Sequence, residues 1–196
     1  IKQHYPALVY YGRWLREAVR CILSGAAIPT WDMSIGYGAD VVTTLSYYVM
    51  GDPLNLIAAF VPSQYGEQLL EGLMILRIYL AGLAFMPFSR HHGNSRFGTL
   101  LGAVAYAFCA WTIQTALTEP LFIIPMYCFP LVLLGADYIF EGRRPTLYIA
   151  AIALSALSNF LFFYMIALLL VLYAVVKYFR KYGIGQLRTL WPLLGK

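Results

Sequence analysis

The feature that most constrains this chain is a series of apolar runs long enough to cross a lipid bilayer. Residues 69–88, 97–117 and 121–140 each approach the roughly 20 mainly apolar residues that a membrane-spanning helix needs. Hydrophobic residues make up 61% of the sequence and charged residues 12%, a balance that excludes an ordinary soluble domain. The sequence therefore predicts an all-α, polytopic membrane helix bundle.

The basic residues predict which ends of these helices face the cytoplasm. The linkers at residues 89–96 and 141–145 are basic, and loops that face the cytoplasm carry an excess of lysine and arginine. Both linkers should therefore be cytoplasmic, with residues 1–68 and the turn at residues 118–120 on the outer side. These clusters also account for the net charge of +5 at pH 7, so that charge is no reason to expect nucleic-acid binding.

The last apolar run, residues 147–179, is too long for one crossing, and lysine and arginine gather at its end. A single crossing would put that basic end outside, against the usual distribution. Polar residues interrupt the run near residues 155–159, so we expect a break that turns the chain back toward the cytoplasm. The first arm would hold only about a dozen residues, less than a full span. One long tilted helix is the alternative that hydropathy leaves open.

The first 68 residues differ from the rest of the chain. Apolar residues recur at helical spacing between residues 5 and 22, with charged residues among them, which predicts an amphipathic helix on the outer membrane surface. After Pro29 the sequence is rich in glycine and aromatic residues, with short helical turns expected over residues 41–50 and 53–60. We therefore expect a large extracytoplasmic loop over residues 1–68 and a membrane region over residues 69–196.

Six segments, in order along the chain, resemble the YfhO-type bacterial membrane proteins, which belong to the GT-C class of polytopic glycosyltransferases. They read IKQHYPALVYYGRWLRE, WDMSIGYGADVVTTLSYYVMGDPLNLIAAFVP, LRIYLAGLAFMPF, LLGAVAYAFCAW, FPLVLLGADYIFEGRRPTLYIA and SNFLFFYMI. The resemblance implies a GT-C-type bundle in a bacterial cytoplasmic membrane. It also implies transfer of a sugar from a polyprenyl-phosphate carrier to an extracytoplasmic cell-envelope acceptor, such as a teichoic-acid-type polymer. The identity of the sugar and any need for a divalent metal stay open.

The resemblance also implies a longer protein. Members have much longer chains, and the family's acidic residue is expected just upstream of the Lys2-Gln3 pair. This chain starts at Ile1 without a methionine or a signal peptide, and another apolar stretch begins at residues 191–194. We therefore expect a fragment that lacks the first membrane helix and the main catalytic carboxylate.

Three aspartates in the outer loop, Asp32, Asp40 and Asp52, are the candidate carboxylates for such a reaction. Glycosyl transfer from a lipid phosphate needs a carboxylate to take the acceptor proton, cations to stabilise the departing phosphate, and aromatic faces. Asp40 and Asp52 each precede an expected short helix, so both can instead be helix caps. We assign Asp32, beside Trp31, and Asp40 as candidate catalytic residues and Asp52 to substrate binding.

Arg77 lies within the first predicted span, where a cation is costly and normally faces a partner or a wet cavity. At the usual rise of an α-helix, about 1.5 Å per residue, it lies about 12 Å below the start of the span at Leu69. A carrier phosphate reached from outside would lie at this depth, so we predict that Arg77 and Asp32 share one cavity. An ion pair of Arg77 with Glu71 or Glu119 is the alternative.

Tyr47, Tyr48 and Glu119 complete the predicted substrate-binding set. The two tyrosines can stack on a sugar or an isoprenoid, although tyrosines also line membrane interfaces without a ligand. The pair His91-His92 lies in a short linker and should be solvated. The three cysteines have no paired spacing, so neither a disulfide nor a metal site is implied.

Two other functions remain open from the residues alone. In a transporter or flippase subunit, Arg77, Gln114 and Asn159 would line a translocation path. In a non-catalytic membrane scaffold, the outer loop would bind a partner. Transfer of labelled sugar by the full-length protein separates both from a glycosyltransferase.

Overall fold

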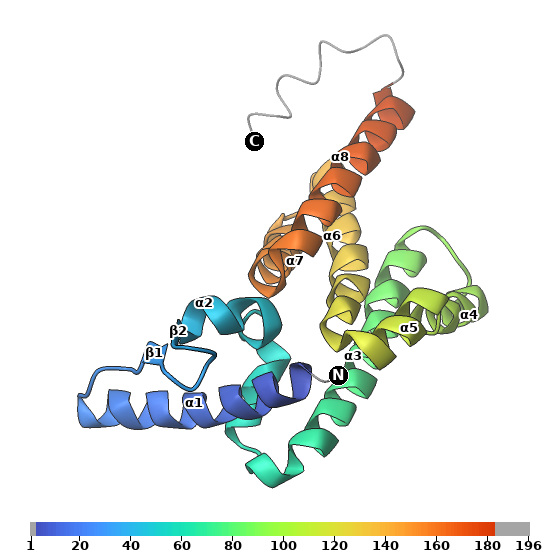
Figure 1. The fold of residues 1–196 in the computed structure, drawn as a ribbon. Coiled ribbons are helices and arrows are strands. Elements are labelled where there is room, and N and C mark those ends of the chain that lie inside the picture. Colours follow the sequence, from blue (N-terminus) through green and yellow to red (C-terminus); the bar gives the residue numbers. More distant parts are fainter. Residues whose placement is uncertain (1–2, 183–196) are drawn as a thin grey trace.

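The computed structural model describes residues 3–182 and is almost entirely helical (Figure 1). Within these residues four helical segments are long and apolar enough to cross a membrane: Ser63–His91, Arg96–Thr118, Pro120–Phe140 and Phe160–Lys181. The all-α polytopic bundle expected from hydropathy is therefore confirmed. The rest of the expected membrane region, including the apolar stretch at residues 191–194, lies outside the described residues.

The first three spans are joined by short turns. Their elements are α3 (Gly66–His91), α4 (Arg96–Ala107), α5 (Ala110–Thr118), the 3₁₀ turn η4 (Pro120–Ile123) and α6 (Ile124–Phe140). Pro120 starts the third span, where its missing N–H donor is not needed. The second span is interrupted at Phe108 and Cys109, between α4 and α5. Neither residue type is a helix breaker, so hydropathy does not predict this interruption.

The last apolar run is a hairpin of two helices, α7 (Thr146–Ser158) and α8 (Phe160–Tyr182). Asn159 lies between them in an extended conformation, with φ −162° and ψ 118°. Its side-chain Oδ1 accepts the backbone N–H groups of Leu161 and Phe162 at 3.0 and 3.3 Å, which caps α8. The break falls within the expected interval, and one continuous helix is excluded.

Contacts at the two ends of the bundle show how the chain runs. At one end, Glu119 pairs with His4, and the α7–α8 turn packs against Gly51, so both turns contact the N-terminal residues. At the other end, Lys181 Nζ donates to the carbonyl oxygen of Phe140 at 2.5 Å, so α8 returns beside the end of α6 (Figure 1). The basic residues at the end of α8 therefore lie with the basic linkers, as the up-and-back path requires.

α6 is the most buried of the spans, with α3 and α7 packed on it. The residues that hold this part of the bundle together are Ala84, Leu121, Ile124, Tyr127, Cys128, Val132, Ala151 and Ile166. Helices inside a bilayer gain no hydrophobic burial from each other, so close van der Waals packing of such side chains stabilises the bundle. α8 keeps most of its apolar surface exposed, as expected of a helix that faces lipid.

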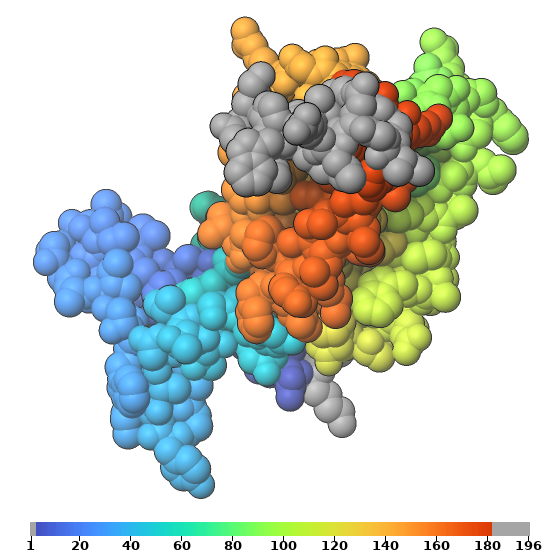
Figure 2. All heavy atoms as spheres, turned by 90° about the horizontal axis from the view of Figure 1, so that it is seen from above, coloured from blue at the N-terminus to red at the C-terminus, as the bar shows by residue number. Residues whose placement is uncertain are grey.

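Residues 3–65 form a second part of the molecule, which we call the N-terminal layer. Figure 2 shows much of it as a lobe beside the bundle. Its elements are α1 (His4–Ser24), β1 (Trp31–Asp32), β2 (Ala39–Asp40), α2 (Val41–Leu45), the π-helical turn η1 (Ser46–Met50) and the 3₁₀ helices η2 (Pro53–Ala59) and η3 (Ser63–Tyr65). The short helices lie where turns were expected, whereas the antiparallel β1–β2 hairpin was not predicted.

α1 has the expected amphipathic pattern, and the first part of its apolar face packs on protein. Its buried residues recur at helical spacing: His4, Leu8, Tyr11, Gly12 and Ala18. At Gly12 the backbone of η2 comes so close that an added Cβ atom would lie 2.4 Å from the carbonyl oxygen of Ala58. Further along, Val19, Ile22 and Leu23 are exposed. α1 therefore attaches the N-terminal layer to the bundle through its first half.

Candidate functional site

Arg77 is held by two residues of the N-terminal layer. Its Nε and Nη2 atoms donate to Oδ2 of Asp52 at 2.9 and 2.7 Å, and Nη2 also donates to Oδ1 of Asn55 at 2.8 Å. The side chains of Arg77 and Asp52 are each 1% exposed. The alternative of an ion pair with Glu71 or Glu119 is therefore wrong, because Asp52 takes that place.

The position of Asp52 follows from its role as a helix cap. Its Oδ1 accepts the backbone N–H of Leu54 at 3.0 Å, and Pro53 occupies the first turn of η2. The capping alternative is therefore confirmed, while the other carboxylate oxygen holds Arg77. Asn55 is fixed in turn, because its Nδ2 donates to the carbonyl oxygen of Val49 at 2.9 Å. One short 3₁₀ helix thus presents both partners of the arginine.

A second polar pair lies beside this network. Nε2 of His4, in the first turn of α1, pairs with Oε2 of Glu119 in the turn between the second and third spans. The other ring nitrogen, Nδ1, is buried and has no hydrogen-bond partner among the described residues. The His4 ring meets Tyr48 edge-on at 5.9 Å, and Tyr48 meets Tyr47 at 5.1 Å. Sequence reasoning missed His4, since no motif surrounds it.

These residues gather where the N-terminal layer meets the bundle, in a region that we call the junction. It consists of His4, Tyr48, Asp52, Asn55, Arg77 and Glu119. A small hollow here is lined by His4, Tyr48, Asn55 and Arg77. Four of the predicted substrate-binding residues are thus brought together from three separate segments of the sequence, and Tyr47 lies at their edge.

An apolar hollow of about 370 Å³ opens next to the junction. It is lined by Pro53, Leu54, Leu80, Leu83, Ala84, Tyr127, Leu131 and Leu154. Pro53 directly follows Asp52, and Leu80 lies about one helical turn beyond Arg77. Tyr127 is buried, and its hydroxyl has no hydrogen-bond partner among the described residues. Such orphaned polar atoms call for an explanation, of which a ligand is one.

Asp32 lies elsewhere, in a groove between α1 and the β1–β2 hairpin. The groove encloses about 410 Å³ and is lined by Tyr10, Arg13, Trp14, Glu17, Pro29, Trp31, Asp32, Ser34 and Val41. Arg77 lines the small hollow of the junction instead. The prediction that Asp32 and Arg77 share one cavity is therefore wrong. Helical spacing within α1 and α3 could not show that the hairpin folds over α1, away from α3.

Two hydrogen bonds set the chemistry of Asp32. The hydroxyl of Tyr10 donates to its Oδ2 at 2.5 Å, and the backbone N–H of Ser34 donates to its Oδ1 at 2.7 Å. These bonds hold the pKa of Asp32 below its usual value of 3.8, while burial and the bond to Asp32 raise the pKa of Tyr10 to about 12. A carboxylate with a lowered pKa is a weak general base but a good hydrogen-bond acceptor. The geometry of Asp32 therefore favours binding over proton transfer.

Asp40 serves as the cap of α2. Its Oδ1 accepts the backbone N–H of Thr43 at 2.7 Å, and this bond lowers the pKa of Asp40. The capping alternative is confirmed here too. Asp40 is not among the residues that line the groove, although β2 pairs it with Trp31 on the neighbouring strand.

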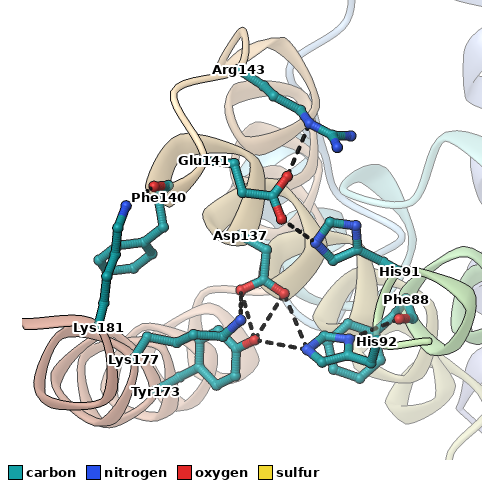
Figure 3. Close-up of polar contacts among 10 residues, drawn as sticks. All are labelled: Phe88, His91, His92, Asp137, Phe140, Glu141, Arg143, Tyr173, Lys177 and Lys181. Atoms are coloured by element: carbon teal, nitrogen blue, oxygen red, sulfur yellow. Dashed lines mark hydrogen bonds and ion pairs between the residues drawn. The ribbon is translucent and has the colours of Figure 1, made fainter. Parts of the chain in front are cut away.

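A third polar cluster lies at the opposite end of the bundle (Figure 3). The side chain of Asp137 on α6 is fully buried and accepts the hydroxyl of Tyr173 at 2.7 and 2.9 Å. Lys177 Nζ lies 2.8 Å from Oδ1, and His92 Nε2 lies 3.3 Å from Oδ2. This arrangement, which we call the Asp137 cluster, ties the ends of α3, α6 and α8 together.

Both histidines of the first basic linker take part in such contacts. His91 Nε2 lies 2.9 Å from Oε1 of Glu141, whose Oε2 lies 2.9 Å from Nε of Arg143 (Figure 3). His91 and His92 therefore pair with acidic residues near the end of α6. The prediction that both are solvated is wrong for His91, which is partly buried, whereas His92 is exposed. Within the described part of the chain, no group of three His, Cys, Asp or Glu residues is arranged to hold a metal ion.

The residues of the predicted translocation path do not meet. Arg77 is bound to Asp52, the side chain of Asn159 caps α8, and Gln114 is exposed on α5.

Comparison with known proteins gives one family: a family model described as bacterial membrane protein YfhO matches residues 15–193. No curated protein and no solved structure matches the chain. The matched range includes Arg77, Asp52, Asp32 and most of the groove.

Proposed function

Because the chain belongs to the YfhO family of bacterial membrane proteins, we propose that it is a membrane glycosyltransferase. In this proposal it transfers a sugar from a polyprenyl-phosphate carrier to a cell-envelope acceptor outside the cytoplasmic membrane. The observation that supports this most is the junction, where a buried cation and an orphaned histidine nitrogen line one small hollow. The neighbouring apolar hollow is lined by Tyr127, whose hydroxyl is also orphaned. Residues 3–65 are then extracytoplasmic, and the Asp137 cluster faces the cytoplasm.

The junction has the two kinds of surface that a lipid phosphate requires. The apolar hollow takes part of the isoprenoid chain, because its lining is almost entirely hydrocarbon. The hydroxyl of Tyr127 is a donor without a partner among the described residues. Arg77 uses Nε and Nη2 for Asp52 and Asn55, which leaves Nη1 for a phosphate oxygen. The departing phosphate is thus stabilised by a fixed charge in a site that excludes water.

His4 is the residue of the junction best arranged to take the proton of the acceptor. Glu119 holds one ring nitrogen, and the other has no partner among the described residues, which is the arrangement of a histidine oriented by a carboxylate. In the reaction the acceptor oxygen bonds to the anomeric carbon, and the bond from that carbon to the carrier phosphate breaks. The hydroxyl proton moves to His4 Nδ1, and the carrier leaves as the phosphate.

The test is a transfer assay with the full-length protein in liposomes. A radiolabelled sugar on polyprenyl phosphate is the donor, and isolated cell-envelope polymer is the acceptor. His4→Gln should lower turnover by about a hundredfold or more, the usual contribution of general acid–base catalysis. Tyr127→Phe should raise the donor concentration needed for half-maximal rate and leave turnover nearly unchanged.

His91→Gln is the matched control, because His91 also pairs with a glutamate but lies at the opposite end of the bundle. It should keep full activity. If His4→Gln and Tyr127→Phe both insert normally and show the donor dependence and rate of the unmodified protein, the junction is not the donor site. Movement of a fluorescent polyprenyl phosphate across the liposome without sugar transfer would favour a flippase instead.

A further inference from the structure

We propose that the groove between α1 and the β1–β2 hairpin binds a neutral saccharide and holds the acceptor chain at a distance from the reacting sugar. Saccharide binding follows from the groove itself, and only the identification of that saccharide as part of the acceptor rests on the proposed function. The junction and the groove are then two sites of one protein, joined by α1.

One wall of the groove is a single face of α1. Tyr10, Arg13, Trp14 and Glu17 follow the i, i+3, i+4, i+7 spacing that places side chains on one side of a helix. This face differs from the buried one that packs on η2. α1 therefore uses one stripe for attachment and leaves a polar and aromatic stripe for a ligand.

The aromatic rings of the groove are fixed through their polar atoms. Trp14 Nε1 donates to the carbonyl oxygen of Pro29 at 2.7 Å, and Trp31 Nε1 lies 3.4 Å from the sulfur of Met33. The hydroxyl of Tyr10 donates to Asp32. Each polar edge already has a protein partner, and one face of Trp14 stacks on Tyr11 at 6.2 Å. The ring faces turned toward the groove remain as the binding surface. The C–H face of a sugar ring stacks on such flat apolar surfaces.

The charges in the groove select for a neutral ligand. Arg13 contributes one positive charge, and Glu17 and Asp32 contribute two negative ones. Asp32 stays ionised because its bonds to Tyr10 and Ser34 stabilise the carboxylate. A net negative lining repels a phosphate but offers charged acceptors to hydroxyl groups. The groove therefore fits the sugar units of an acceptor better than the phosphates of a teichoic-acid-type chain.

The next arginine along α1 does not reverse this balance. Arg16 Nη1 donates to the carbonyl oxygens of Ala58, Ala59 and Val61 at 3.1 to 3.2 Å. Its charge is thus directed at the end of η2, where exposed carbonyl groups favour a cation. Arg16 belongs to the attachment of α1, and the groove keeps its negative balance.

The position of the groove along α1 separates it from the reacting atoms. Tyr10 lies about 9 Å along the helix axis from His4, at the usual rise per residue. A sugar that stacks in the groove is therefore not the one that reacts at the junction. It lies further along the same acceptor chain.

Binding is tested with the purified full-length protein in nanodiscs by saturation-transfer NMR, without any donor. The probes are methyl glycosides of glucose, galactose and N-acetylglucosamine, with glycerol 3-phosphate as the charged comparison. At least one glycoside should receive saturation, and glycerol 3-phosphate should receive none. Trp31→Ala should abolish the signal, and Asp32→Asn should weaken binding by about tenfold, since a charged acceptor is lost.

Two matched controls come from the same hairpin. Tyr37 is fully exposed and lies outside the groove, so Tyr37→Ala removes an aromatic ring of the hairpin without touching the lining. Asp40→Asn removes a carboxylate that caps α2. Both should bind like the unmodified protein, and Trp31 is itself so exposed that its removal should leave the fold intact.

The outcomes separate this proposal from the proposed function. Unchanged glycoside binding in Trp31→Ala and Asp32→Asn, or binding of glycerol 3-phosphate alone, overturns the assignment of the groove. Absence of binding by all three glycosides overturns it as well. Glycoside binding together with a lack of sugar transfer keeps the groove and removes the transferase.

Discussion

The junction and the Asp137 cluster both place a carboxylate and a cation together at an end of the bundle, but they differ in how the charges are enclosed. At the junction, Arg77 and Asp52 are each 1% exposed. In the Asp137 cluster the carboxylate is buried, whereas the side chains of Lys177 and His92 are 28% and 33% exposed. At the junction both charged side chains are therefore shielded from water and salt, whereas in the Asp137 cluster only the carboxylate is shielded.

The two networks also differ in redundancy. Asp52 has Arg77 as its cationic partner, while Asp137 contacts Lys177, His92 and the Tyr173 hydroxyl. Removing one partner of a buried pair leaves an uncompensated charge, which costs far more than the pair contributes. Burial and the number of partners, more than distance, therefore decide how much stability is lost when one member of a charged contact is removed.

The largest effect is expected from Arg77→Met. This change leaves the Asp52 carboxylate buried without a cation, so it should destabilise the attachment of the N-terminal layer by about 3 to 5 kcal/mol. Hydrogen exchange of residues 53–59 measures this locally, because η2 is the element that carries Asp52. Exchange there should rise steeply, with the bundle helices much less affected.

The double variant Asp52→Asn with Arg77→Met is the control for this experiment. With both charges removed, η2 should recover much of its protection, since replacing both members of a buried pair is often nearly neutral. Equal exchange in the single and double variants would mean that the unpaired charge is not the cause. Arg20→Met, on the exposed side of α1, should leave exchange unchanged.

A smaller effect is expected from Lys177→Met in the Asp137 cluster. Lys177 is partly exposed, and Asp137 keeps Tyr173 and His92, so the loss should be about 1 kcal/mol or less. Thermal unfolding in detergent at low and high salt measures it. The salt dependence should be greater for the unmodified protein than for the variant. A loss as large as that of Arg77→Met would mean that exposure and the number of partners do not determine the cost of removing a cation.

The smallest effect concerns the docking of the hairpin on α1 and depends on pH. Because the pKa of Asp32 is lowered below 3.8 in the folded chain, its bonds stabilise docking fully above that value. The contribution is lost as the pH falls through the lowered pKa. Limited proteolysis of residues 31–40 should therefore be faster at pH 3 than at pH 5.

Asp32→Asn should remove that part of the pH dependence, because an amide does not titrate in this range. Asp40→Asn should keep the pH dependence of proteolysis that is due to Asp32. Asp40 also has a lowered pKa, so its replacement removes only the separate pH dependence of the α2 cap. If Asp32→Asn cleaves with the same pH dependence as the unmodified chain, the bond from Tyr10 does not control docking.

The sequence predicts the parts of the fold that rest on properties of neighbouring residues. Long apolar runs identify the spans, and polar residues near Asn159 together with the basic end of α8 indicate the hairpin. Aspartates that precede Val41 and Pro53 indicate the two caps. Each of these signals needs only a short window of sequence and a local physical rule.

Rules that use only a short window of sequence cannot predict contacts between distant segments. Arg77 was expected to have a partner, but periodicity cannot show that a residue 25 positions earlier supplies it. The same holds for His4 with Glu119, which are 115 positions apart. The acidic partners of His91 and His92 near the end of α6 were missed because nothing in their linker reveals them. Candidate residues were therefore found more easily than their grouping into sites.

The packing of the α7–α8 turn against Gly51 has a consequence for how the protein is made. A Cβ atom at Gly51 would lie 2.2 Å from the carbonyl oxygen of Leu157, so this contact forms only with a glycine there. α7 has 13 residues, too few to enter a bilayer by itself as a full span. Gly51 leaves the ribosome long before α7 does. The N-terminal layer is thus synthesised before the hairpin, and its backbone at Gly51 supplies the surface against which the end of this short helix packs.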